Sequence, residues 1–147
     1  MREEIYSKLE DLKKYVQFLG SYQSHRKEEL RENYTLRGAV ERYLQLALEC
    51  TLDVGEMIIS IEGFRKPETY REVIEILGEE GILPREFAKR FAPSMGFRNI
   101  LVHRYAEVDL DELYRHLQDD LEDFNTFAKY VAKYVEGKSR PAKNRSP

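Results

Sequence analysis

The sequence predicts an all-α fold. Apolar residues recur three or four positions apart through most of the chain, and no segment alternates apolar and polar residues for long enough to suggest a strand. The 147 residues fit one domain, and a chain of this length can bury roughly two-thirds of its unfolded surface. We expect an antiparallel bundle of four longer helices with one or two short helices inserted, formed by residues 1–137.

The first two helices are predicted from the spacing of their aliphatic residues. The first helix carries Ile5, Leu9, Leu12, Val16 and Leu19. The polar residues 24–33 are either an exposed extension of this helix or the connection to the next one. The second helix is expected to begin near Thr35 and to end at Gly63, because glycine readily adopts the left-handed conformation that commonly ends a helix.

Capping residues and prolines predict the next three elements. Thr69 and Glu72 have the spacing of a capping box, which indicates a helix over about 70–80. Proline is favoured in the first turn of a helix, so Pro84 and Pro93 each indicate the start of a short helical piece.

The last helix has the clearest start. Asp109 is a suitable N-cap, and Glu112 stands at the third helical position, where it completes a capping box. Apolar spacing then continues to Gly137. The tail 138–147, KSRPAKNRSP, is basic and lacks apolar clusters, so we expect it to be disordered.

Composition restricts the classes of function. A net charge of −3 argues against non-specific coating of nucleic acid, although it leaves a local basic cleft open. The lone Cys50 cannot form a disulfide within the chain, and its apolar neighbours suggest a core position. The charged N-terminus lacks the apolar run of a signal peptide, and no segment approaches the ~18 apolar residues of a membrane span. We therefore expect a soluble, cytoplasmic protein.

Residues 96–105, GFRNILVHRY, place three aliphatic residues between polar ones. On a helix with about 100° per residue, Asn99 and His103 share one face, and Arg98 and Tyr105 share a stripe. Arg98 and His103 diverge by about 140°. The two side chains can meet only under one of three conditions: the long Arg98 side chain bends around the helix, the helix ends near His103, or a symmetry-related chain brings its own copies of these residues close.

These side chains suit phosphodiester cleavage. The imidazole of His103 can take a proton from a ribose 2′-hydroxyl or give one to a leaving 5′-oxygen. Arg98 offers a planar fork of donors that fits phosphate oxygens, and Asn99 can orient the imidazole or donate to a phosphate. None of this requires a metal, and His25 and His116 show no metal-ligand spacing with His103. On chemistry alone, ordinary capping and surface salt bridges are the commoner roles of such residues.

The run from Arg98 to Tyr105 resembles the Arg-x4-His-x-Tyr signature of the HepT-like branch of the HEPN ribonuclease toxins. An asparagine directly after the arginine is also typical of HEPN nucleases. The resemblance extends over about residues 1–136. Residues 39–58, AVERYLQLALECTLDVGEMI, are similar to the long second helix of the family, including Glu41, Arg42 and Asp53. The segments TYREVIEILGEEGILP and HRYAEVDLDELY also read like segments of the family.

The resemblance implies a helical bundle that forms a homodimer, with Arg98 and His103 of both protomers lining one cleft. It further implies a metal-independent endoribonuclease without a cofactor, acting as a toxin on RNA, in which Arg98 and His103 are catalytic and Asn99 supports them. A nucleotidyltransferase antitoxin would transfer AMP from ATP to Tyr105. The added bulk and negative charge beside Arg98 would oppose RNA binding.

Other residues and other functions remain open from the sequence. Arg37 and Arg42 are candidates for the rim of a phosphate site, and Glu41 or Asp53 for pairing with Arg98, although an ordinary salt bridge is the simpler role for each. The first alternative function is a non-enzymatic module that docks onto a nucleotidyltransferase or binds nucleotide. The second is a purely structural helical dimer.

Overall fold

The computed structural model describes residues 1–139, except for the side chains of Tyr105 and Ser139, so most of the predicted basic tail lies outside the described residues. The described part is helical and contains no strand, which confirms the predicted fold class. Its elements are α1 (Arg2–Gly20), α2 (Lys27–Glu32), α3 (Tyr34–Glu62), α4 (Tyr70–Glu79), α5 (Arg85–Phe91), the 3₁₀ turn η1 (Ala92–Gly96), α6 (Phe97–His103), the 3₁₀ turn η2 (Tyr105–Glu107), α7 (Leu110–Asp119) and α8 (Leu121–Ser139).

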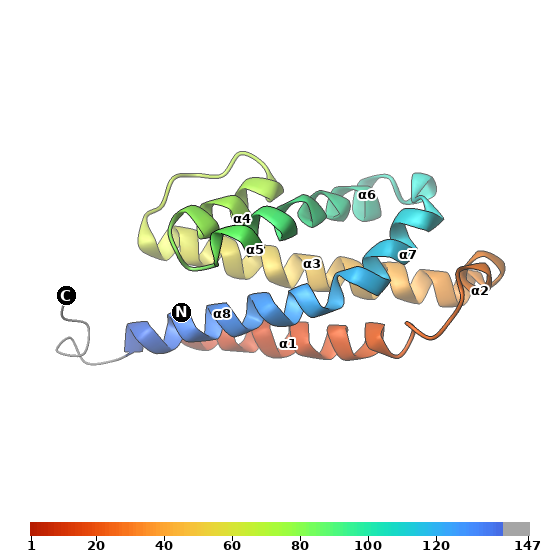
Figure 1. The fold of residues 1–147 in the computed structure, drawn as a ribbon, viewed down its shortest axis with the longest axis horizontal. Coiled ribbons are helices and arrows are strands. Elements are labelled where there is room, and N and C mark those ends of the chain that lie inside the picture. Colours follow the sequence, from red (N-terminus) through yellow and green to blue (C-terminus); the bar gives the residue numbers. More distant parts are fainter. Residues whose placement is uncertain (140–147) are drawn as a thin grey trace.

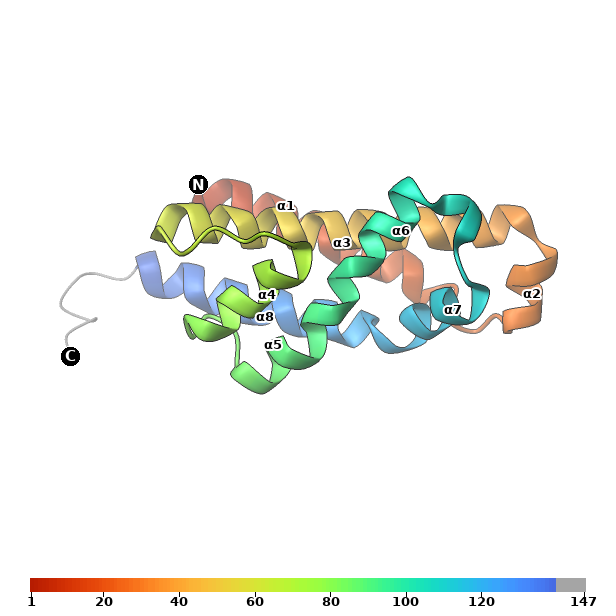
Figure 2. The same ribbon diagram turned by 90° about the horizontal axis from the view of Figure 1, so that it is seen from above.

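The long helix α3 lies between two groups of helices. On one side it packs along α1, which in turn contacts α8, and on the other side it contacts α4 and α6 (Figure 1). Seen from above, α6 crosses over α3 (Figure 2). The apolar faces of all these helices meet in one cluster of buried residues. The site described below lies where α3, α4 and α6 meet.

The predicted helix ends are confirmed at three places. The Thr69 hydroxyl accepts a hydrogen bond from the Glu72 amide at the start of α4. The Asp109 carboxylate accepts one from the Glu112 amide at the start of α7. Gly63 follows α3 with φ of 70°, in the left-handed region that favours glycine.

The prediction of one continuous last helix is wrong, because the helix breaks at Asp120. The carbonyl oxygen of Asp120 accepts the hydrogen bond of the Phe124 amide and so begins α8. Its carboxylate is buried and lies 2.5 Å from Nδ1 of His116. After the break, α8 continues past the predicted end at Gly137 to Ser139.

The polar residues 24–33 connect α1 to α3 and contain the short helix α2. They are therefore a connection, with one helical segment that the sequence did not predict. No helix within the described residues is long and apolar enough to cross a membrane.

Candidate active site

The helix α6 has only seven residues and is fixed by its buried face. Phe97 and Leu101 are buried, and the Phe97 ring stacks on the His116 imidazole with 4.3 Å between ring centroids. His116 is itself held by the Asp120 carboxylate. The break between α7 and α8 thus provides the support on which the start of α6 rests.

Arg98 follows Phe97 and is held from three directions. Its Nε and Nη2 both donate to Oε2 of Glu49 on α3, at 3.2 and 3.1 Å. Its Nη1 lies 3.5 Å from the Asn99 side-chain oxygen, and its guanidinium carbon lies 5.4 Å from the ring centroid of Tyr70 on α4. The side chain is 20% exposed, so the cation is partly shielded from water.

A cavity of about 410 Å³ opens beside this arginine. Arg98, Asn99 and His103 all line it, although Arg98 and His103 diverge around the helix. Because α6 ends at His103, one of the three predicted conditions for their convergence is met. The opposite wall comes from α3, from the segment that leads into α4 and from the first turn of α4, and its polar and aromatic residues are Glu56, Glu68, Thr69 and Tyr70.

Tyr105 begins η2, two residues after His103, and its side chain lies outside the described part of the structure. Two contacts between Arg104 and Glu107 close the turn that contains Tyr105. The Glu107 amide donates to the Arg104 carbonyl oxygen at 2.8 Å, and the Arg104 guanidinium donates to the Glu107 carboxylate at 2.5 Å. The main chain at Tyr105 is therefore placed directly after the residues that line the cavity.

The candidate pairing of Arg98 with Glu41 or Asp53 does not occur, and each carboxylate has the simpler role expected for it, an ordinary salt bridge. Glu41 accepts a hydrogen bond from Arg37 at 3.0 Å, one turn away on α3. Asp53 accepts one from Lys8 of α1, also at 3.0 Å, on the side of α3 that packs along α1. Each carboxylate forms a salt bridge away from the cavity.

Glu49 was not predicted from the sequence as the partner of Arg98. Of the two arginines considered for the rim of a phosphate site, Arg37 instead has the simpler role, a salt bridge to Glu41. Arg37 donates to the Val108 carbonyl oxygen at 2.6 Å and so ties α3 to the segment before α7, whereas Arg42 is exposed on α3. Neither lines the cavity. A signal for Glu49 was present, because Glu49 and Glu56 are seven residues apart and share one side of α3. To identify Glu49 as the partner of Arg98, one would also need to know where α6 crosses α3, which the sequence does not give.

The arrangement joins a fixed cation, an amide and an imidazole around one hollow. Such a set can bind a phosphate and exchange a proton beside it. Within residues 1–139, no group of three or more His, Cys, Asp or Glu side chains is placed to hold a metal ion.

Comparisons with known proteins agree with the fold and identify the family. A family model described as ribonuclease HepT-like matches residues 5–131. A tRNA nuclease HepT from Aphanizomenon flos-aquae is 28% identical over 131 residues, which cover 89% of each chain.

Two solved structures share the fold. YutE of Bacillus subtilis, described as a cytosolic protein of unknown function, superposes with a TM-score of 0.81 at 24% identity, covering 95% of this chain and 94% of YutE. The tri-AMPylated HEPN toxin of Shewanella oneidensis, solved in complex with its MNT antitoxin, has a TM-score of 0.80 at 23% identity, covering 90% and 99% of the two chains. Because the family model spans most of the sequence, the chain belongs to the HepT-like ribonuclease family.

Proposed function

We propose that this protein is a metal-independent endoribonuclease toxin that cleaves RNA in the cavity at the end of α6. The observation that carries the proposal is the shared cavity of Arg98, Asn99 and His103. Membership in the HepT-like ribonuclease family supports the same reaction class. The relative from Aphanizomenon flos-aquae is named a tRNA nuclease, which makes RNA the substrate class to test first.

In the proposed reaction, the imidazole of one His103 takes the proton of a ribose 2′-hydroxyl. The 2′-oxygen then forms a bond to phosphorus while the bond from phosphorus to the 5′-oxygen breaks, leaving a 2′,3′-cyclic phosphate. The leaving 5′-oxygen takes a proton from a second, protonated imidazole. Arg98 donates to the phosphate oxygens, on which negative charge grows in the transition state.

We propose a homodimer as the source of the second imidazole. His103 is exposed at the end of α6, so a partner chain related by a two-fold axis can approach it. One cleft would then contain two copies of Arg98 and two of His103. This arrangement assigns the base and the acid to separate protomers.

Neutralisation by AMP transfer to Tyr105 is the second part of the proposal, with a nucleotidyltransferase antitoxin as the partner. Tyr105 starts η2 directly after the residues of the cavity. Each AMP adds a negatively charged phosphate and a bulky base, which would repel RNA phosphate and occupy the cleft. The Shewanella toxin with the same fold is tri-AMPylated and bound to an MNT antitoxin.

Substitution His103→Ala tests the catalytic assignment. We expect RNA cleavage by the unmodified protein to fall by at least ~10²-fold, because the proton-transfer group is lost, while the thermal unfolding midpoint stays near that of the parent. His25→Ala is the matched control, since His25 contacts Glu29 on α2 and lies outside the cavity. Cleavage by His103→Ala at the parental rate would remove His103 from the mechanism.

A further inference from the structure

A second hollow adjoins the cavity of Arg98 and His103. Its volume is about 400 Å³, and it shares Glu56 and Pro67 with the first cavity. Ile59 and Phe64 supply apolar wall, and Lys66 lies at the hollow as well. The two hollows therefore lie next to each other along α3, beside the segment between α3 and α4, and together they are called the groove below.

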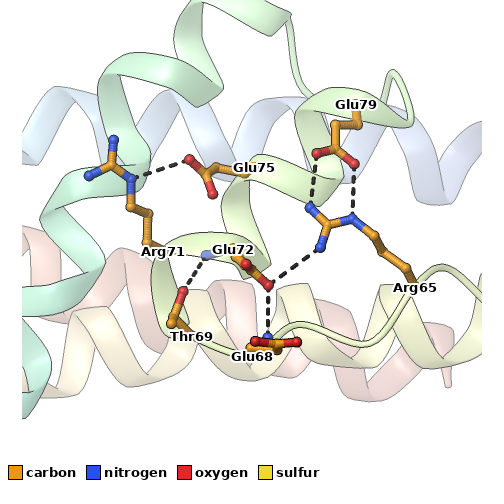
Figure 3. A network of polar contacts seen from close by, with 7 residues as sticks. All are labelled: Arg65, Glu68, Thr69, Arg71, Glu72, Glu75 and Glu79. Carbon is orange, nitrogen blue, oxygen red and sulfur yellow. Dashed lines mark hydrogen bonds and ion pairs between the residues drawn. The ribbon is translucent and has the colours of Figure 1, made fainter.

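This segment is held in place by a polar network (Figure 3). Arg65 donates to both carboxylate oxygens of Glu79, at 2.9 and 3.3 Å, and to Glu72 at 3.4 Å. Glu72 also accepts a hydrogen bond from the Glu68 amide at 2.8 Å, and its own amide donates to Thr69. The wall of the groove is thus organised before any ligand arrives, which lowers the entropic cost of binding.

The groove contains two opposite charges without protein partners. Glu56 and Lys66 are both exposed, and neither forms an ion pair or side-chain hydrogen bond within residues 1–139. Partial burial, together with the nearby Asp53 carboxylate, raises the pKa of Glu56. A ligand suited to this hollow therefore has an anionic group, hydrogen-bond donors and a flat apolar body. A nucleotide has all three.

We propose that the second hollow is the subsite for the nucleotide that flanks the scissile phosphate in the RNA strand. Lys66 binds the phosphate of this nucleotide, and the Glu56 carboxylate accepts a hydrogen bond from an amino group on the edge of its base. Phe64 and Pro67 provide the apolar surface beside the base. This subsite rests on the proposed function, in which the cavity of Arg98 receives the scissile phosphate.

Binding of non-cleavable RNA tests the subsite without requiring catalysis. Fluorescence anisotropy would compare 2′-O-methyl oligonucleotides of two and eight residues over a range of salt concentrations, using the full chain. For Lys66→Gln, we expect the slope of log affinity against log salt for the longer RNA to fall by about 0.7, because one phosphate contact is lost. Dinucleotide binding should be unchanged.

The control is Lys129→Gln, which removes the same charge from an exposed lysine on α8. Identical salt slopes for Lys66→Gln and Lys129→Gln would overturn the subsite, and so would a parent protein that does not bind the longer RNA. If the parent binds RNA and Lys66→Gln lowers the salt slope, but the parent never cleaves a natural strand, the proposed function fails, and the second hollow is assigned to RNA binding without cleavage.

The base contact has its own test. With a single cytosine or uracil at the flanking position, we expect the parent to prefer cytosine, whose amino group can donate to Glu56, by at least about threefold. Glu56→Gln should remove this preference. A free mononucleotide is the other source of the same chemistry. If Lys66→Gln weakened binding of cytidine monophosphate but not of the longer RNA, the hollow would be assigned to free nucleotides and the RNA subsite would be wrong.

Discussion

Arg98 on the short helix α6 presents its Nε and Nη2 to a single carboxylate oxygen of Glu49 on the long helix α3. This contact fixes the plane of the guanidinium relative to α3. Nη1 lies 3.5 Å from the Asn99 side-chain oxygen, and Arg98 lines the cavity together with Asn99. Glu49 therefore acts as a positioning residue for the group that we propose binds phosphate.

Substitution Glu49→Ala is expected to lower kcat for RNA cleavage by about tenfold with a smaller change in KM, because a mobile guanidinium fits the transition state less well. Glu49→Gln keeps an acceptor oxygen and should restore most of the activity. Asp111→Ala is the control, since it breaks the salt bridge to Lys27 on α2, outside the cavity. Steady-state kinetics would measure the effect, and a variant faster than the parent would mean that Glu49 restrains Arg98.

Modification of Tyr105 is expected to appear as added mass. The protein would be expressed with and without a nucleotidyltransferase encoded nearby, and its intact mass measured in each case. We expect increments of one AMP unit only in the presence of the partner, mapped to Tyr105 by peptide sequencing. Tyr105→Phe should stay unmodified and retain RNA cleavage. An unchanged mass in the presence of the partner would remove the regulatory part of the proposal.

Gly78 marks a close approach between α4 and α5. A Cβ atom at this position would lie 2.5 Å from Cβ of Ala88, which is much shorter than an ordinary contact. Gly78→Ala should therefore reduce the free energy of unfolding by about 1–3 kcal/mol through overpacking. Gly38→Ala is the matched control, because a Cβ there meets nothing within 4 Å and a helical alanine is favoured over glycine by about 0.5–1 kcal/mol. Urea denaturation would measure the free energy of unfolding of both variants, which should be lower than that of the parent for Gly78→Ala and higher for Gly38→Ala.

The contact between Tyr134 and Glu62 should make stability depend on pH. The Tyr134 hydroxyl and the Lys138 ammonium group both donate to the Glu62 carboxylate and lower its pKa from the ordinary value of 4.5. A lowered carboxyl pKa stabilises the fold above pH 4.5, and this contribution is lost as the pH falls through the folded-state pKa. Tyr134→Phe is therefore expected to cost about 1–2 kcal/mol at pH 7 and less at pH 3.

Chemical denaturation at the two pH values would measure this difference. An equal cost at both pH values would show that Tyr134 stabilises the fold by packing, without a contribution from the charge of Glu62.

Much of the fold could be predicted because helix periodicity and capping are local properties. The caps at Thr69, Asp109 and Gly63 are determined by side chains within a few residues of each helix end. The break at Asp120 was missed because the apolar spacing keeps its phase across it. The beginning of α8 was marked by Asp120, a residue type favoured at N-caps, and by the acidic residues directly after Leu121, which are typical of a helix start.

Only the site residues that lie on one helix could be predicted from the sequence. Arg98, Asn99 and His103 belong to a single segment, so their relative directions follow from helix geometry. Glu49 and Tyr70 come from helices that are distant in the sequence. Their contacts with Arg98 depend on where α6 crosses α3 and α4, and this crossing results from packing of the whole bundle.

The seven-residue length of α6 limits how the motif could be transferred to another protein. An isolated helix of two turns is unstable in water, since helices shorter than about 12–15 residues are marginal even in favourable sequences. A peptide with the sequence GFRNILVHRY would hold every side chain of the motif without the arrangement that makes them a site. The motif cannot be moved to another scaffold by itself, because the stacking of Phe97 on His116 and the acceptor at Glu49 would have to move with it.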